Sequence, residues 1–147
     1  MDIAHCLATI DLLCTREFPT EHGRTDVGEA GPGYFTAELQ TSGEFWDDDG
    51  SEREETAAQY EYDRDGLSER LAERWGPPDR FSLASVLDRF MEGEDIPAPW
   101  GTLSGHVPNL YLWQPPRVER YVALGVSQWD KELPFQLLAI VTEVDPP

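Results

Sequence analysis

The apolar stretch FQLLAIVTEV at residues 135–144 limits the fold of this chain more than any other part of its sequence. Every residue from Leu137 to Val141 is apolar. Successive side chains of a strand point to opposite faces of its sheet, so a strand formed by these residues is apolar on both faces. We therefore predict a central strand here rather than an edge strand.

Three further runs of residues predict the partners of this strand. Residues 109–114 (NLYLWQ) and 120–129 (RYVALGVSQW) are rich in apolar side chains, and residues 34–41 (YFTAELQT) alternate between apolar and polar ones. Two adjacent prolines separate the first two of the three C-terminal runs, and DKELP separates the second from the last. Connections this short typically join neighbouring antiparallel strands.

Three segments have the residue spacing of amphipathic helices. Residues 3–14 do, although LATIDLL within them also fits a short buried strand; we favour the helix. Residues 55–75 form the second segment, in which Gly66 costs about 1 kcal/mol relative to alanine and predicts that the helix starts afresh nearby. Residues 83–92 form the third segment, with Ser82 as the expected N-cap.

Two segments rich in glycine and proline, residues 20–33 and 94–108, are expected to be loops. Together with the predicted strands and helices they indicate an α+β fold. We expect a mostly antiparallel sheet of about four strands with two or three helices packed on one face. The length of 147 residues fits a single domain spanning residues 1–147.

The charge balance argues against several classes of partner. The chain has 29 acidic and 11 basic residues, a formal net charge of −18. Such a surface repels the phosphates of nucleic acids and of anionic membranes, so we expect neither as a partner. The two cysteines cannot form a disulfide framework, and the first residues lack the basic and uninterrupted apolar regions of a signal peptide. These features predict a cytoplasmic protein.

The sequence predicts neither a metal site nor any other cofactor. An EF-hand loop requires glycine at its sixth position and oxygen ligands around it. The frame that places Gly50 correctly puts Phe45 at the first ligand position, and the frame that starts at Asp47 puts a glutamate where glycine is required. Cys6 and Cys14 would lie about 12 Å apart along a helix axis, too far apart to bind one zinc ion.

Signals for catalysis are weak. The chain contains no GxSxG, GxxxxGK or GxGxxG motif. His106, in a predicted loop with Ser104 nearby, is the best single residue for acid–base or nucleophilic chemistry. No spacing groups these two side chains with a particular carboxylate, so the sequence favours a non-catalytic role.

The segment from Glu44 to Asp65 gives the strongest indication of function. Ten acidic and two basic residues give it a net charge of −8, and four aromatic residues lie among them. Carboxylates speed the encounter with a basic protein, and aromatic side chains supply binding hot spots. The sequence therefore predicts a protein-binding module. The expected binding residues are Phe45, Trp46, Asp47, Asp48, Asp49, Glu52, Glu55, Tyr60 and Tyr62.

The sharpest form of this hypothesis is an inhibitor or immunity protein that acts on a basic toxin or enzyme. Small acidic inhibitors of basic nucleases use the same electrostatic logic, and the analogy rests on size and charge alone. The alternative reading is that the acidic segment is a solvated loop and helix face whose aromatic side chains point into the core.

A second hypothesis is a small-ligand-binding protein or minor enzyme. Its pocket would be lined by Trp100, His106, Arg117 and Arg120, because arginine forks beside aromatic rings hold carboxylates or phosphates well. The competing interpretation of the two arginines is that they neutralise neighbouring acids along a sheet edge. A third hypothesis, that the chain functions through oligomeric assembly, also remains open.

Overall fold

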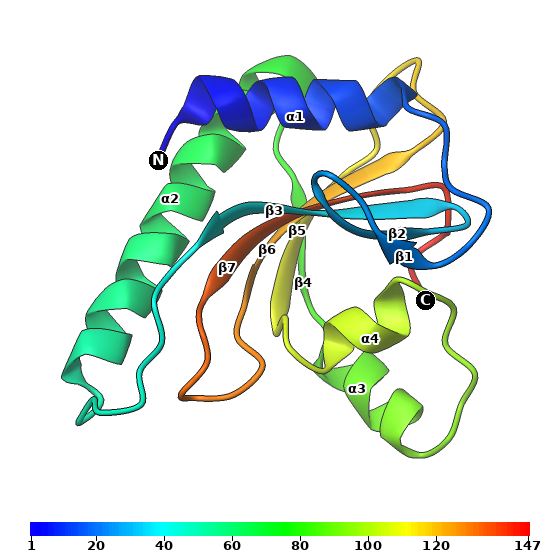
Figure 1. Cartoon of the computed structure of the whole chain (residues 1–147). Coiled ribbons are helices and arrows are strands. Elements are labelled where there is room, and N and C mark those ends of the chain that lie inside the picture. Colours follow the sequence, from blue (N-terminus) through cyan, green and yellow to red (C-terminus); the bar gives the residue numbers. More distant parts are fainter.

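The computed structural model describes all 147 residues and is built around one sheet of seven strands (Figure 1). Every pair of neighbouring strands is antiparallel, in the order β1-β2-β3-β7-β6-β5-β4. The strands are β1 (Gly23–Arg24), β2 (Gly28–Gly31), β3 (Tyr34–Thr41), β4 (Asp79–Ser82), β5 (Asn109–Trp113), β6 (Tyr121–Ser127) and β7 (Gln136–Thr142). The helices are α1 (Ile3–Thr15), α2 (Ser51–Trp75), α3 (Ala84–Met91) and α4 (Trp100–Ser104).

The predicted central strand is confirmed. β7 lies between β3 and β6 with three strands on either side, and its residues from Leu137 to Thr142 are all buried. Leu137, Ala139 and Val141 belong to one hydrophobic cluster, whereas Leu138 and Ile140 belong to another. The two clusters lie on opposite faces of the sheet, since successive side chains of a strand alternate between faces.

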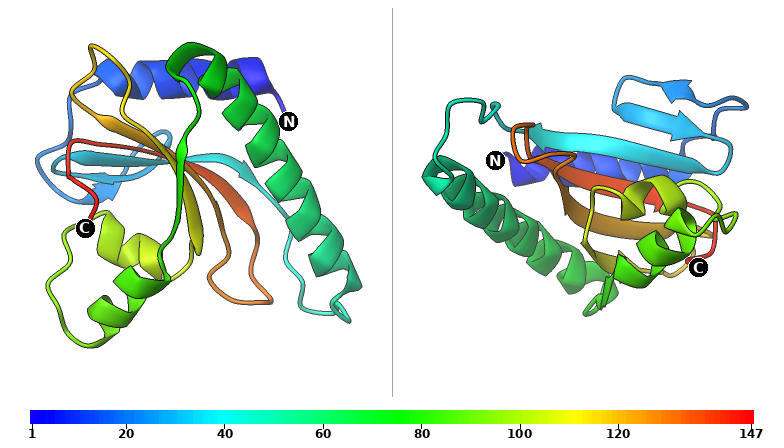
Figure 2. Two further views of the ribbon diagram at one scale, coloured as in Figure 1. Left: turned by 180° about the vertical axis from the view of Figure 1, so that it is seen from behind. Right: turned by 90° about the horizontal axis from the view of Figure 1, so that it is seen from below.

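The predicted arrangement of about four strands with helices on one face is wrong. α1 and α2 pack against one face over a core of 19 buried residues, and α3 and α4 pack against the other over a core of ten (Figures 1 and 2). The sheet also has three strands that the sequence did not predict, namely β1, β2 and β4. The fold remains α+β, but as three layers with the sheet in the middle.

The unpredicted strands are short and poor in the residues that favour strands. β1 has two residues and β2 reads GEAG, within the segment expected to be a loop. Pro32 and Gly33 connect β2 to β3 as a two-residue hairpin turn, and the φ angle of 85° at Gly33 needs the freedom of glycine. β4 reads DRFS and follows two prolines at the opposite edge of the sheet.

The two longer predicted helices are present, and α2 is longer than expected. The helix over residues 3–14 is confirmed by α1. α2 begins at Ser51 and continues through Gly66 without a break, so the predicted fresh start near that glycine is wrong. Burial of Tyr60, Leu67 and Leu71 on one side of α2 holds both halves of the helix against the sheet, which outweighs the helix propensity lost at one glycine.

The acidic residues before α2 stabilise its first turn. The carboxylate of Asp48 accepts hydrogen bonds from the backbone N–H groups of Glu52 at 3.1 Å and of Arg53 at 2.9 Å. Asp49 accepts bonds from the N–H of Ser51 at 3.0 Å and from its hydroxyl at 2.7 Å. Negative charge at this position also interacts favourably with the helix dipole. Two carboxylates of the acidic segment therefore have a structural role.

Replacing Asp48 with alanine is expected to lower the free energy of unfolding by about 1 kcal/mol, because two N–H groups of the first turn lose their acceptor. Urea denaturation followed by circular dichroism measures the change. Asp47→Ala is the matched control, since Asp47 is exposed and its side chain makes no hydrogen bond or ion pair. Equal stability of the two variants would contradict the capping role.

The opposite face of the sheet carries the segment at 94–108, which was predicted to be an extended loop. It instead contains the short helix α4, whose Trp100 is fully buried and donates its Nε1–H to the carbonyl of Val144 at 3.1 Å. Gly125 of β6 allows Val107, which follows α4, to pack closely against the sheet. A Cβ at position 125 would lie 2.5 Å from Val107 Cγ1. This close approach fixes the position of His106, the neighbour of Val107.

Candidate functional site

The structure divides the four aromatic residues of the acidic segment into two pairs. Phe45 and Tyr60 are buried in the core between the sheet and the α1–α2 layer, and so do not contribute to an outer surface. Trp46 is 64% exposed and Tyr62 is 74% exposed. The indole N–H of Trp46 donates to the carboxylate of Glu44, which keeps the ring beside an acidic side chain at the surface.

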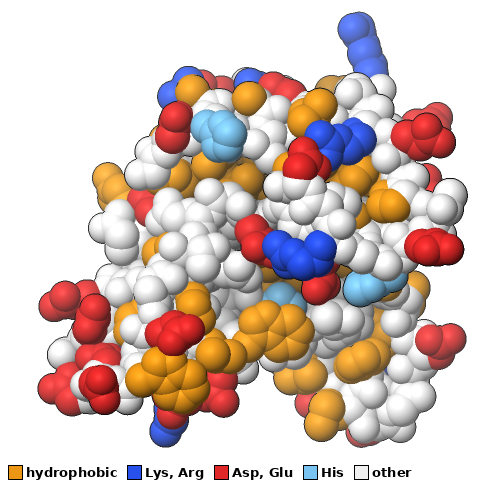
Figure 3. Space-filling model, viewed as in Figure 1, with side chains coloured by type: hydrophobic (Ala, Val, Ile, Leu, Met, Phe, Trp, Pro, Cys, Tyr) orange, Lys and Arg blue, Asp and Glu red, His pale blue; other side chains and the backbone are white.

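The carboxylates of the segment also divide by role. Asp48 and Asp49 accept hydrogen bonds from the first turn of α2, whereas Asp47, Glu52 and Glu55 are exposed and make no side-chain hydrogen bond or ion pair. Figure 3 shows acidic side chains gathered at the corner of the molecule where α2 begins, with hydrophobic side chains at the surface beside them. We call Trp46, Asp47, Glu52 and Glu55 the acidic end.

A second loop is hydrogen-bonded to two residues that adjoin members of the acidic end in sequence. The N–H of Phe45 donates to the carbonyl of Glu132 at 2.9 Å, and the guanidinium of Arg53 donates twice to Gln128 Oε1, at 3.1 and 2.9 Å. Glu132 and Gln128 belong to the connection between β6 and β7, which also carries Trp129. Trp129 is 56% exposed, so neighbouring loops at this end of the sheet present two tryptophans to solvent.

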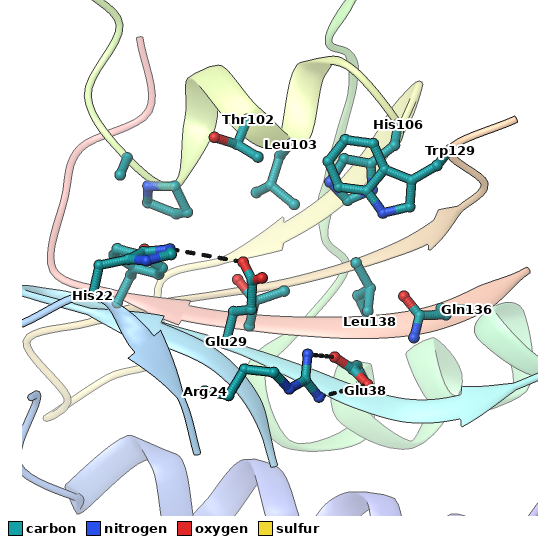
Figure 4. Close-up of a pocket in the computed structure, with 14 residues that line it drawn as sticks. His22, Arg24, Glu29, Glu38, Thr102, Leu103, His106, Trp129, Gln136 and Leu138 are labelled. Atoms are coloured by element: carbon teal, nitrogen blue, oxygen red, sulfur yellow. Dashed lines mark hydrogen bonds and ion pairs between the residues drawn. The ribbon is translucent and has the colours of Figure 1, made fainter. Parts of the chain in front are cut away.

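A cavity of about 220 Å³ lies on the α3–α4 face of the sheet, beside α4 (Figure 4). Its floor comes from β1, β2, β3 and β7, and its wall from α4 and the loops on either side of it. Trp129 closes one end of the cavity. The lining residues are His22, Arg24, Glu29, Tyr34, Thr36, Glu38, Ala98, Pro99, Thr102, Leu103, His106, Trp129, Gln136 and Leu138.

The charged residues of the cavity form two pairs on its floor. Arg24 donates to the two carboxylate oxygens of Glu38 at 2.8 and 3.1 Å, a bidentate arrangement. His22 Nε2 lies 3.7 Å from a carboxylate oxygen of Glu29, beyond hydrogen-bond distance. Figure 4 shows the Glu29 carboxylate extending from the sheet toward α4. The negative charge of Glu29 is therefore less fully neutralised by a neighbouring cation than that of Glu38.

His106 and Trp129 form the aromatic end of the cavity. Their rings are stacked, with centroids 3.7 Å apart and an angle of 16° between the planes. His106 Nδ1 shares a hydrogen bond of 2.6 Å with the hydroxyl of Ser127. Burial lowers the pKa of His106 to about 4, because the imidazolium would lose its hydration there. The ring is therefore neutral at pH 7.

His106 and Ser127 do not have the geometry of an accessible nucleophile and base. Ser127 is only 1% exposed, so a substrate atom cannot reach its hydroxyl. Ser104, the serine nearest in sequence, donates instead to the carbonyl of Gly101 at 2.6 Å. The hydrogen bond between His106 and Ser127 orients the ring that supports Trp129.

The four residues of the sequence-based pocket do not converge. Trp100 is 0% exposed in the core beneath α4, and Arg117 is exposed in the connection between β5 and β6. Arg120 donates to the carbonyl of Leu13 at 2.6 Å and places its guanidinium 3.9 Å from the ring centroid of Phe18, on the α1 side of the sheet. Only His106 lines the cavity.

Nothing in the sequence indicated that most of the cavity residues belong to a binding site. His22, Arg24 and Glu29 lie in a segment that was expected to be a loop, and Glu38 looked like the polar side of a half-buried strand. Trp129 ended a predicted strand. The strand order brings them together, and the pairing of β1, β2 and β3 was not predictable from spacing.

The structure contains neither a cluster of metal ligands nor a helix able to cross a membrane. No group of three or more histidine, cysteine, aspartate or glutamate side chains is arranged to hold a metal ion. Cys6 is buried and Cys14 half-buried, and both are free thiols on α1. None of the four helices has the length and apolar character needed to cross a membrane.

The fold defines a class of architecture: an α+β domain in which helix pairs cover both faces of an antiparallel seven-stranded sheet. Comparisons with protein-family models, with curated proteins and with solved structures give no significant match.

Proposed function

We propose that this chain is a non-catalytic protein-binding module that recognises a basic partner through the acidic end. The exposure of Trp46 among unpaired carboxylates is the observation that carries the proposal. A ring that is 64% exposed contributes little to the fold, whereas tryptophan at the centre of an interface is a frequent hot spot.

Charge supports a basic partner in particular. Asp47, Glu52 and Glu55 are unpaired at the acidic end, within a chain whose formal net charge is −18. Such a surface raises the rate of encounter with a cationic protein and disfavours acidic ones. Tyr62, on the exposed side of α2, extends the same surface along the helix. The proposal does not include Phe45 and Tyr60, because both are buried.

The sharpest form of the proposal is inhibition: an acidic chain that covers a cationic active site, as an immunity protein does for a toxin. The proposal includes a cytoplasmic location, where thiols such as those of Cys6 and Cys14 stay reduced. An inhibitor of this kind lowers the activity of the captured partner when the purified chain is added.

The test is capture of a basic protein by the immobilised chain from lysate of the source cells. Binding is expected at low salt and lost in about 1 M salt, where the screening length is about 3 Å. Trp46→Ala is expected to weaken binding of the identified partner about 30-fold, the loss of one hot spot. Neutralising Asp47, Glu52 and Glu55 together is expected to slow association about tenfold.

The matched control neutralises three exposed acids outside this surface, Glu92, Asp95 and Glu119, which removes the same charge from the chain. It is expected to retain most of the binding. Asp48 and Asp49 are left intact, because their loss would alter α2. The proposal fails if no basic protein is captured, or if both acidic-end variants bind as well as the control variant.

A further inference from the structure

We propose that the cavity beside α4 is a binding site for a guanidinium or ammonium group, with the Glu29 carboxylate as its anionic partner and the Trp129 ring as its aromatic wall. This site is separate from the acidic end, since neither Trp46 nor Asp47 lines it. The inference does not depend on the proposed function.

The charge of the cavity favours a cation. Glu29 and Glu38 outnumber Arg24, so the lining has a formal net charge of −1 when His22 is counted as neutral. The bidentate bond between Arg24 and Glu38 neutralises that pair locally. Glu29 lies 3.7 Å from His22 and across the strand pair from Arg24, whose guanidinium is hydrogen-bonded to Glu38 instead, and the Glu29 side chain is 51% exposed. Its carboxylate is therefore free to accept hydrogen bonds from an incoming cation.

The aromatic end provides the second element of a cation site. Cations are attracted to the electron-rich face of an indole ring. Trp129 is held in place by its stacking on His106, and His106 by its hydrogen bond to Ser127. Burial keeps the pKa of His106 near 4, so the supporting ring is neutral at pH 7 and does not repel a cation.

The remaining lining sets the size and shape of the ligand. About 220 Å³ corresponds to roughly seven water molecules at about 30 Å³ each. This space fits a cationic head with a short aliphatic stem and is smaller than the pockets of drug-sized ligands. Leu103, Leu138 and Pro99 offer apolar contacts for the stem, and Thr36, Thr102 and Gln136 add polar side chains to the lining.

The test uses butylguanidinium and its neutral counterpart butylurea, which have nearly the same shape. Binding to the full chain is followed by calorimetry and by amide chemical shifts. Butylguanidinium is expected to saturate one site and to shift resonances of α4, β2 and the Trp129 loop. Butylurea is expected to bind at least about tenfold more weakly, because it forms no charge-assisted hydrogen bonds.

Variants then assign the site. Glu29→Gln is expected to weaken butylguanidinium binding about tenfold, and Trp129→Leu is expected to weaken it as well. Glu92→Gln, an exposed acid on the α3 side, removes the same charge and is expected to bind like the unaltered chain. Equal binding by Glu29→Gln, equal binding of butylurea, or shifts confined to α2 would overturn the proposal.

Two sources of such a cation are separated by a second pair of probes. An arginine residue blocked at both ends represents a side chain presented by another polypeptide, and agmatine, which carries a guanidinium and an ammonium group, represents a free small molecule. Binding of the blocked arginine indicates that the cavity accepts a side chain from a protein. Binding of agmatine alone indicates a small-molecule ligand. Failure of both probes contradicts the proposal, even if the acidic end captures a basic partner.

Discussion

Replacing Trp100 with alanine is expected to destabilise the protein by about 3–5 kcal/mol, the range for removing a large buried aromatic side chain. Trp100 is 0% exposed and lies within the ten-residue core between α3, α4 and the sheet. Its removal leaves a cavity that the surrounding residues fill only partly. It also leaves the carbonyl of Val144 without the Nε1–H donor at 3.1 Å.

The measurement is the midpoint and slope of urea denaturation for the Trp100→Ala chain. Trp100→Phe keeps a ring in the core but removes the donor, so its loss is expected to be smaller. Trp46→Ala serves as the control, because that ring is 64% exposed and its removal is expected to change stability by less than about 0.5 kcal/mol. A comparable loss in the Trp46 and Trp100 alanine variants would contradict the assignment of the second core.

The same substitution tests how the cavity is built. Pro99, Thr102 and Leu103 line the cavity from the segment that Trp100 anchors. If α4 moves when its anchor is lost, butylguanidinium binding should fall even at urea concentrations where the Trp100→Ala chain remains folded. Because Trp100 does not touch the cavity, this loss would report on support of the wall rather than on a lost contact.

Lowering the pH from about 6.5 to 4 is expected to remove up to about 3 kcal/mol of stability through His106 alone. Its pKa in the folded chain is about 4, against 6.5 for an unperturbed histidine, and burial is the cause. Between these two values the unfolded chain binds a proton that the folded chain does not bind. Stability from this residue is therefore complete above pH 6.5 and declines as the pH falls toward 4.

The ring resonances of His106 provide a direct measurement, with a titration midpoint expected near pH 4 in the folded chain. Denaturation at a series of pH values gives the effect on stability. Other groups also titrate below pH 6, so the control is His106→Gln, whose stability should vary less with pH in this range. Identical pH dependence of the two chains would show that His106 is not desolvated.

The sequence predicts the centre of this fold better than its edges. The run from Leu137 to Val141 marks β7 because a strand covered on both sides needs apolar residues at every position. Apolar residues on both sides of this strand also imply that other elements pack on both faces of the sheet. The prediction of helices on one face did not take this into account. β2 is not predicted because two of its four residues are glycines, which have low strand propensity. Hydrogen bonding to β3 compensates for this low propensity in the folded chain.

The candidate sites show the same difference between local and long-range information. The charge excess of the acidic segment is readable from sequence, but the burial of Phe45 and the exposure of Trp46 depend on packing against Phe135 and the core. The cavity combines residues 22–38, 98–106 and 129–138, which meet only through the strand order. His106 could be singled out in advance, whereas its stacking partner Trp129 could not.

The two outer strands of the sheet affect how copies of this molecule meet one another. Open sheet edges are templates along which identical chains can pair and aggregate. Here one edge, β1, is two residues long, and the other, β4, follows two prolines and carries Asp79 and Arg80. Neither edge offers a long flat row of free backbone groups, and the net charge of −18 adds repulsion between copies. Both features oppose edge-to-edge pairing of copies of this chain.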